Sequence, residues 1–442
     1  MKKFWFQSIV ITVFVFSMLW VANQASDLKI FTAFDSVGQA LKDFDLTNYA
    51  FAELRETPEV DDRIVLVNIG RLPRRGLAEQ IQAINQYKPR IIAMDILFSC
   101  EGGLRDTVNC PELIDVMGNL MLSNAIKEAG NVILGSKLLQ SRALAQVDSN
   151  EADSLEISDP EFSDYSKEGF VTLPTDATYQ EDVKKCNSIF PKWDLKGEEQ
   201  LAFSVQIAMQ YDSVKAKKFL ARNKDEELIN FRGNMEVLQL RLNSLKNNDT
   251  GTTKFGTLFY SVDVDDIMRG NVLGELFKDR IVMMGYLGDY LGDSAWEDKF
   301  FTPMNKKLAG RANPDMFGLV VHANAVAMIL NEDYVDELSD FQKYSVAFLV
   351  CLFTVALFIW IDRKMPMWFD ALSVFIQLLE VLLISSFVIY AFAAWSWKLD
   401  LTVAIGVSAL VGPCYDIFKS VQNEVNQRLA KRREMFLKKY AD

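Results

Sequence analysis

The stretch "DDRIVLVNIGRLPRRGLAEQIQAINQYKPRIIAMDILF", residues 61–98, decides the fold that the sequence predicts. Residues 64–69 form a short apolar run rich in β-branched residues, residues 77–87 have helical periodicity, and residues 91–98 form a second apolar run. Strand, helix and strand at this spacing predict a βαβ unit, and both strands are apolar enough to be covered on two faces. We therefore expect an α/β domain with a doubly wound, mostly parallel sheet.

Further segments extend this prediction. Candidate strands of the same sheet are residues 131–136, 227–233, 255–262 and 279–288, and candidate helices are residues 112–129 and 198–211. Residues 27–55 have the apolar spacing of an amphipathic helix. The polar and acidic residues 140–167 are predicted to form an exposed excursion, and residues 242–254 a second surface loop.

Four blocks of sequence are apolar enough to cross a membrane: residues 4–26, 344–361, 371–397 and 399–417. A helix needs roughly 20 such residues to cross the hydrocarbon layer. A cleaved secretory signal begins in the same way as residues 1–26, with a basic start and an apolar core, but its core is shorter. We therefore expect residues 1–26 to be an uncleaved transmembrane anchor.

Basic residues set the expected orientation, because short cytoplasmic loops are rich in Lys and Arg. Lys2 and Lys3, Arg363 and Lys364, and the tail at residues 427–440 fall on one side if there are four spans. Residues 27–342 are then extracytoplasmic, residues 343–418 hold three transmembrane helices, and residues 419–442 form a basic amphipathic cytoplasmic tail. Both termini are cytoplasmic in this arrangement.

Charge supports the same division. The chain has a formal net charge of −12, and its acidic excess lies in residues 27–342, whereas the rest is net basic. An acidic exterior domain argues against nucleic acid as a partner, because a nucleic-acid-binding face needs a basic footprint.

Three of the five cysteines lie in the exterior domain. In an oxidising periplasm, Cys100 and Cys110 are the closest pair and are predicted to form a disulfide, which leaves Cys186 free. The alternative is three free or buried thiols. Cys351 and Cys414 lie in predicted spans, where we interpret them as small apolar residues.

Seven segments resemble a known family: "RIVLVNIG", "IIAMDILF", "INFRG", "FYSVDVDDIMRGNV", "FKDRIVMMGYLGD", "DKFFTPMN" and "FGLVVHANAVAMILN". With one span before the domain and three after it, they resemble the CHASE domain of type two. That domain is an extracytoplasmic sensory module associated with cyclases and histidine kinases. The resemblance covers almost all of residues 27–342 and implies a receptor part whose stimulus is undefined for the family.

The sequence departs from the family pattern in two places. In typical members the last span leads into a cyclase or a kinase, whereas only a short tail follows residue 417 here. The resemblance therefore implies a stand-alone form that lacks a fused output domain. The family also tends to place an acidic residue after the first strand, where this chain has Asn68 before Gly70, so no carboxylate role is carried over to that position.

Candidate ligand-binding residues follow the predicted strands, since ligands of open α/β sheets lie beyond the carboxyl ends of the strands. Asn68, Asp95, Tyr286 and Asp289 are expected at one rim, and Arg232 at the end of another strand. Together they are suited to a small polar ligand. The alternative, which we favour, is that Arg232 and Asp95 form a structural ion pair.

His322 is the only histidine of the chain and lies among valines and alanines. This setting favours a buried residue that packs a helix against the sheet through a hydrogen bond. Ligand contact remains open, and so does pH sensing, because an unperturbed imidazole titrates near pH ~6.5.

No enzyme is predicted, because the sequence has no Gly-rich fingerprint after the first strand, no Walker sequence and no G-x-S-x-G nucleophile elbow. No cysteine pair has zinc-site spacing, and one histidine offers little to a metal, so we expect no metal and no cofactor.

Two features outside the domain carry expectations about contacts. Glu380 lies inside a predicted span, where a carboxyl group usually meets a polar partner, and we expect a bond to Thr402, to Ser408 or to a partner helix. The tail has an apolar face that is suited to a coiled coil, to a cytoplasmic protein or, as we favour, to the membrane surface.

We therefore expect a multi-pass sensor of the inner membrane of a Gram-negative bacterium. Its exterior domain senses a stimulus or binds a partner and passes a rearrangement through residues 319–330 and the bundle to a separate effector. Besides the lipid bilayer, a homodimer or a hetero-complex is expected. The alternative is a structural subunit that holds an envelope complex together without switching.

Overall fold

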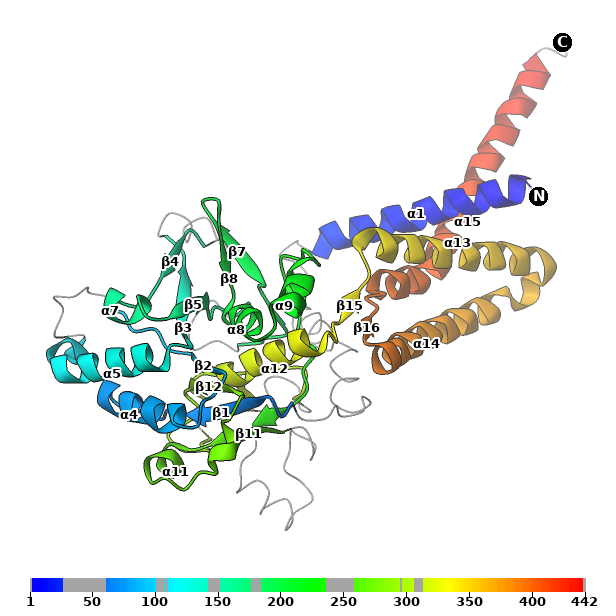
Figure 1. Ribbon diagram of the computed structural model, residues 1–442. Helices are drawn as coiled ribbons and strands as arrows, with labels where there is room; N and C mark the ends of the chain where they lie inside the picture. The colour runs from blue at the N-terminus through cyan, green and yellow to red at the C-terminus, as the bar shows by residue number, and fades with distance from the viewer. Residues whose placement is uncertain are drawn as a thin grey trace. The chain divides into compact units, whose positions relative to one another are not determined.

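The computed structural model describes residues 2–26, 61–100, 108, 110–141, 152–175, 184–235, 258–294, 296–305 and 313–439. The chain divides into two units, residues 51–335 and residues 1–50 together with 336–442 (Figure 1). The helix predicted at residues 27–55 and the surface loop predicted at residues 242–254 lie outside the described residues.

The first unit is built on a sheet of eight strands within the described residues, with the order β10-β11-β1-β12-β2-β3-β4, and β5 also pairs with β3. The strands are β1 (Ile64–Asn68), β2 (Ile91–Met94), β3 (Val132–Leu139), β4 (Ser154–Glu156), β5 (Lys167–Phe170), β10 (Asn234–Met235), β11 (Leu258–Val262) and β12 (Ile281–Gly285). All neighbours are parallel except β3 and β4. Every residue of β1, β2 and β12 is buried, as the apolar runs predict.

Helices pack on the two faces of this sheet (Figure 1). One hydrophobic core contains α4 (Arg74–Asn85), α5 (Val116–Ala129) and α11 (Val264–Met268) together with Val65, Val67 and Ile92. The other contains α8 (Phe203–Tyr211), α9 (Ser213–Leu220) and α12 (Gly318–Asn331) together with Ile64 and Leu66. Successive side chains of a strand point to opposite faces, so a single apolar run contributes to both cores.

The prediction that residues 140–167 form only an exposed excursion is wrong for the part that the structure describes. This part contains β4, the short helix α7 (Pro160–Ser163) and the first residue of β5. The Phe162 ring is fully buried, and its centroid lies 5.1 Å from that of Phe98. Because the segment is acidic overall, its composition did not indicate that Phe162 anchors it in the core.

Two further predictions need correction. Residues 198–201 do not begin a helix: β7 (Lys192–Leu195) and β8 (Glu198–Leu201) form an antiparallel hairpin whose turn residues Lys196 and Gly197 have positive φ angles of 57° and 89°. Residues 227–233 do not form a strand of the main sheet. Only β9 (Glu227–Leu228) is extended, and it pairs with β6 (Ser188–Ile189) in a separate sheet.

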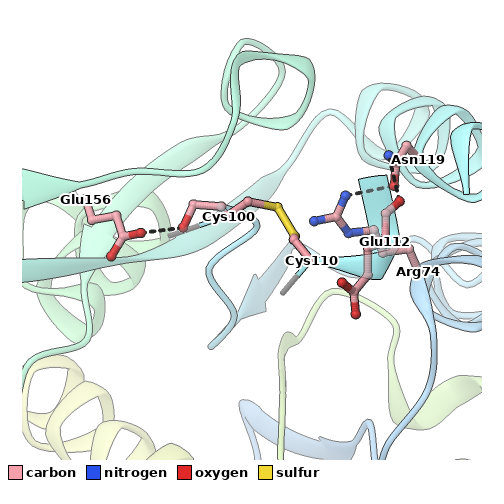
Figure 2. Close-up of a disulfide and its surroundings, with 7 residues drawn as sticks. Arg74, Cys100, Cys110, Glu112, Asn119 and Glu156 are labelled. Carbon is pink, nitrogen blue, oxygen red and sulfur yellow. Dashed lines mark hydrogen bonds between the residues drawn. A yellow bond between two sulfur atoms is a disulfide. The ribbon is translucent and has the colours of Figure 1, made fainter. Parts of the chain in front are cut away.

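The predicted Cys100–Cys110 disulfide is present, with the two Cα atoms 5.9 Å apart, and Cys186, Cys351 and Cys414 are free and buried. It joins the segment after β2 to the short helix η3 (Pro111–Ile114) that precedes α5. Figure 2 shows it between Glu156 on one side and Arg74 and Asn119 on the other. Ser99 Oγ donates to Glu156 Oε1 at 2.6 Å, and Arg74 Nη1 donates to Asn119 Oδ1 at 2.8 Å.

Within the described residues, the second unit contains four helices that are long and apolar enough to cross a membrane: α1 (Lys2–Ser26), α13 (Asp340–Lys364), α14 (Phe369–Trp395) and α15 (Thr402–Lys439). The helices correspond to the four blocks expected from the sequence. The short helix η5 (Pro366–Trp368) joins α13 to α14, and β15 (Asp336–Glu337) pairs with β16 (Trp397–Lys398).

Glu380 makes a helix contact, but with neither of the side chains named from the sequence. Thr354 Oγ1 of α13 lies 2.6 Å from Glu380 Oε1 and 2.9 Å from the carbonyl oxygen of Val350. A single hydroxyl proton serves only one of these two acceptors. Thr354 Oγ1 donates to Glu380 Oε1, the nearer of the two acceptors.

We expect Glu380→Gln to preserve this contact and Glu380→Leu to lose it, because the side-chain carbonyl oxygen of Gln still accepts from Thr354. Loss of an interhelical hydrogen bond in a membrane bundle destabilises by about 1 kcal/mol. Thermal unfolding of the detergent-solubilised chain measures the difference. Thr354→Val in the Glu380→Leu background should add no further loss, and equal destabilisation by Gln and Leu would contradict the assignment.

Candidate functional site

The carboxyl ends of β1, β12 and β2 meet at one edge of the sheet, because β12 lies between the other two strands. The chain leaves β1 for α4 on one face and leaves β12 for α12 on the other. In open α/β sheets a ligand binds at such a point, where neighbouring connections diverge. We name this edge the rim and take it as the candidate functional site.

Asn68 holds the rim together. Its Nδ2 donates to Asp263 Oδ1 at 2.9 Å and to the carbonyl oxygen of Gly288 at 3.0 Å. Its Oδ1 accepts from the backbone N–H groups of Gly70 and Leu287, both at 3.0 Å. A carboxylate here would have no proton to donate to Asp263, so the amide suits this position. Fully buried and fully bonded, Asn68 positions the rim and offers no free group to a ligand.

An exposed polar cluster lies beside Asn68. Arg71 Nε donates to Asp289 Oδ1 at 2.7 Å, and Arg71 Nη2 donates to Glu297 Oε2 at 2.6 Å. The Tyr286 hydroxyl lies 3.1 Å from Asp289 Oδ1 and 3.3 Å from Glu297 Oε2. Exposed ion pairs contribute little to stability, so these groups are available to exchange their contacts for those of a polar ligand.

Tyr286 connects this cluster to the start of α12. Partial burial of the phenol and the Asp289 and Glu297 carboxylates raise the pKa of Tyr286 to about 12, so its hydroxyl stays protonated and donates. Its ring meets the Phe317 ring edge-on, with 6.2 Å between centroids. Phe317 immediately precedes α12.

Asp95 lies at the same edge, after β2. Burial, with a smaller effect from the nearby Asp298 carboxylate, raises the pKa of Asp95 to about 8, so its carboxyl group carries a proton at neutral pH. A Cβ at Gly285 would come within 3.2 Å of Asp95 Cβ and 3.1 Å of Leu319. Gly285 thus lets β12, Asp95 and the first turn of α12 approach closely.

Arg232 does not belong to the rim, and its predicted ion pair with Asp95 is wrong. It pairs with Asp333, and its backbone N–H donates to Asn324 Oδ1 at 2.7 Å. Asn324 also accepts from the Gly233 N–H at 3.1 Å and donates to the Gly233 carbonyl at 2.8 Å. Residues 229–233 are therefore held against α12 rather than at the end of a central strand.

His322 also lies away from the rim, on α12. Its Nε2 lies 3.2 Å from the carbonyl oxygen of Val171, and its ring meets Phe203 edge-on with 5.5 Å between centroids. Burial lowers the pKa of His322 to about 4, so the imidazole is neutral at neutral and mildly acidic pH. These are the contacts of a packed residue.

The structure thus brings Asn68, Asp95, Tyr286 and Asp289 together and separates Arg232 and His322 from them. Sequence reasoning missed Arg71, Asp263 and Glu297. Arg71 follows Gly70, whose φ of +50° turns the chain back toward the rim, so a glycine directly after an apolar run was the available signal. Within the described residues, no group of three or more His, Cys, Asp and Glu side chains is placed to hold a metal ion.

Comparison with protein families gives one match. The model of the CHASE2 domain matches residues 38–360, which is most of the chain, and the protein therefore belongs to the CHASE2 domain family. This family comprises extracytoplasmic sensory domains. Comparison with curated proteins and with solved structures found no match.

We expect Asn324→Ala to lower the free energy of unfolding by roughly 2–4 kcal/mol, because two buried backbone N–H groups and one buried carbonyl then lose their partner. Denaturant unfolding of the full chain measures the loss. Asn124→Ala, at an exposed position of α5, is the matched control and should change stability by less than about 0.5 kcal/mol. Equal effects of the two substitutions would contradict the role of Asn324.

Proposed function

We propose that this chain is a sensor subunit of a bacterial inner membrane. Its doubly wound α/β domain lies in the periplasm, senses a stimulus or binds a partner at the rim, and passes a rearrangement through α12 and the transmembrane bundle to a separate effector. Membership of the CHASE2 domain family supports the sensory role. The proposed role is binding and relay, without catalysis by this chain.

The course of α12 is the observation that carries the relay. At its first residue, the Gly318 N–H donates to the carbonyl oxygen of Asp298 at 3.0 Å, beside the rim. At its last turn, Lys215 Nζ donates to the carbonyl oxygen of Leu330 at 2.6 Å, and Arg63 Nη1 donates to the same oxygen at 3.4 Å. Residues 332–339 then connect α12 directly to α13, the first of the three later spans. Along the chain, one buried helix therefore lies between the rim and α13.

The proposed topology rests on the four apolar helices and on the basic residues near their ends. Arg363 and Lys364 end α13, and Lys419, Arg428 and Lys431 lie on the exposed part of α15. Cytoplasmic retention of these residues places both termini inside and the α/β domain outside.

Thiol labelling tests this topology. Val214→Cys, on α9, has an exposed position in the α/β domain, and Ser420→Cys has an exposed position on α15. We expect a membrane-impermeant maleimide to label the first variant in intact spheroplasts and the second only after the membrane is opened. Labelling in the opposite order would overturn the proposed orientation, and the unsubstituted chain is the control for its own buried thiols.

Purification from native membranes separates a sensor from the alternative, a structural subunit of an envelope complex that does not switch. The matched pair is Arg71→Gln, at the rim, and Arg269→Gln, whose exposed ion pair with Asp265 lies on α11. For a sensor, we expect a co-purifying cytoplasmic enzyme whose activity changes at least about twofold in Arg71→Gln and not in Arg269→Gln. A stoichiometric complex with the same composition and activity in both variants would favour the structural subunit.

A further inference from the structure

A groove of about 450 Å³ lies beside β11, between α11 and the short helix η4 (Gly274–Leu276). It shares no lining residue with the rim. Pockets for small ligands typically measure roughly 300–1,000 Å³, so this groove has room for one small molecule.

Arg280 lines this groove and differs from most of the other arginines that the structure describes in the domain. Its Nη1 atom is buried and has no hydrogen-bond partner, and no carboxylate of the described residues pairs with it. Its guanidinium lies 5.7 Å from the centre of the Tyr260 ring. By contrast, carboxylates pair with Arg63, Arg71, Arg75, Arg222, Arg232 and Arg269. Arg280 lines the groove without a carboxylate partner among the described residues, so an anion in the groove would supply the opposite charge.

The remaining lining restricts which anion fits. Val272, Leu276 and the exposed ring of Tyr260 provide an apolar wall. The exposed carboxylates of Asp266 and Glu275 also line the groove. They repel a ligand with several negative charges and attract an ammonium group, so the lining favours a molecule with one carboxylate, one amine and an apolar body.

We propose that the groove binds a free amino acid with an aromatic or apolar side chain. Arg280 holds the carboxylate, Asp266 and Glu275 attract the ammonium group, and the side chain packs on Tyr260 and the apolar wall. This site deepens the proposed sensory function by naming a class of stimulus, and only its link to switching rests on that function.

Calorimetric titration of the full-length protein in detergent micelles tests the site. The probes are phenylalanine, phenethylamine, which lacks the carboxylate, phenylacetate, which lacks the amine, and inorganic phosphate. We expect phenylalanine to bind most tightly and phenethylamine and phosphate to give no measurable binding. Arg280→Met should weaken phenylalanine binding roughly tenfold to a hundredfold, because a charged hydrogen bond is lost. The control Arg269→Met, at the residue that follows α11, should bind as the unsubstituted protein does.

Thermal unfolding separates a binding role of Arg280 from a structural one. Since its Nη1 atom is buried without a hydrogen-bond partner in the free protein, Arg280→Met should leave the Tm of the free protein unchanged or higher, while it removes the rise in Tm that phenylalanine causes. A fall in the Tm of the free variant, equal binding of phenylalanine and phenethylamine, or the absence of binding by any probe would each overturn the site. None of these outcomes bears on the sensor proposal, which the Arg71 variants test. If phenylalanine binds but the partner's activity does not respond to it, the groove stands and its link to switching fails.

Discussion

The fold depends on the burial of one helix. Every residue of α12 from Gly318 to Leu330 is buried, and the helix is apolar on all sides. Such a helix is stable in water only when protein encloses it completely, which α8, α9 and one face of the sheet do here. The few polar groups on α12 depend on partners inside the protein: Asn324 bonds residue 233, and Nε2 of His322 bonds residue 171.

Charged groups lie at the two ends of α12. A helix has a partial positive charge at its N-terminus and a partial negative charge at its C-terminus. The Asp298 carboxylate oxygens lie 3.3 and 3.4 Å from the position that a Cβ would take at Gly318, the first residue. At the other end, Lys215 and Arg63 donate to the carbonyl of Leu330. Opposite charges therefore hold the helix at both termini.

The elements that the sequence predicted correctly are those with a long, uninterrupted apolar pattern. The strands β1, β2 and β12 are buried on both faces, so their apolar runs stand out, and the four membrane helices are recognised by length and composition. The edge strand β5 and the hairpin of β7 and β8 are short and partly polar, so their local sequence pattern did not predict strands there. The partner of Arg232 depends on Asp333, which is 101 residues away in sequence, and no local pattern carries that contact.

The rim residues also divide into those that the sequence predicted and those that it did not. Asn68 and Tyr286 follow strand ends, and the parallel sheet alone brings them to one edge. Arg71 and Glu297 lie in loops, where the direction of each side chain depends on backbone turns such as the one at Gly70. Periodicity does not encode these turns, although it does predict the edge to which they return.

These contacts differ in strength in a way that favours motion of α12 as a whole. The rim cluster around Arg71 is exposed, so its ion pairs exchange with water or a ligand at small free-energy change. The bonds of Asn324 are buried, and breaking them is much less favourable. On the proposed relay, a stimulus at the rim would shift Tyr286 against Phe317 before it disturbed the middle of the helix. Because a packed core deforms little, the proposed shift would displace α12 along its length rather than bend it, and residues 332–339 would carry the displacement to α13.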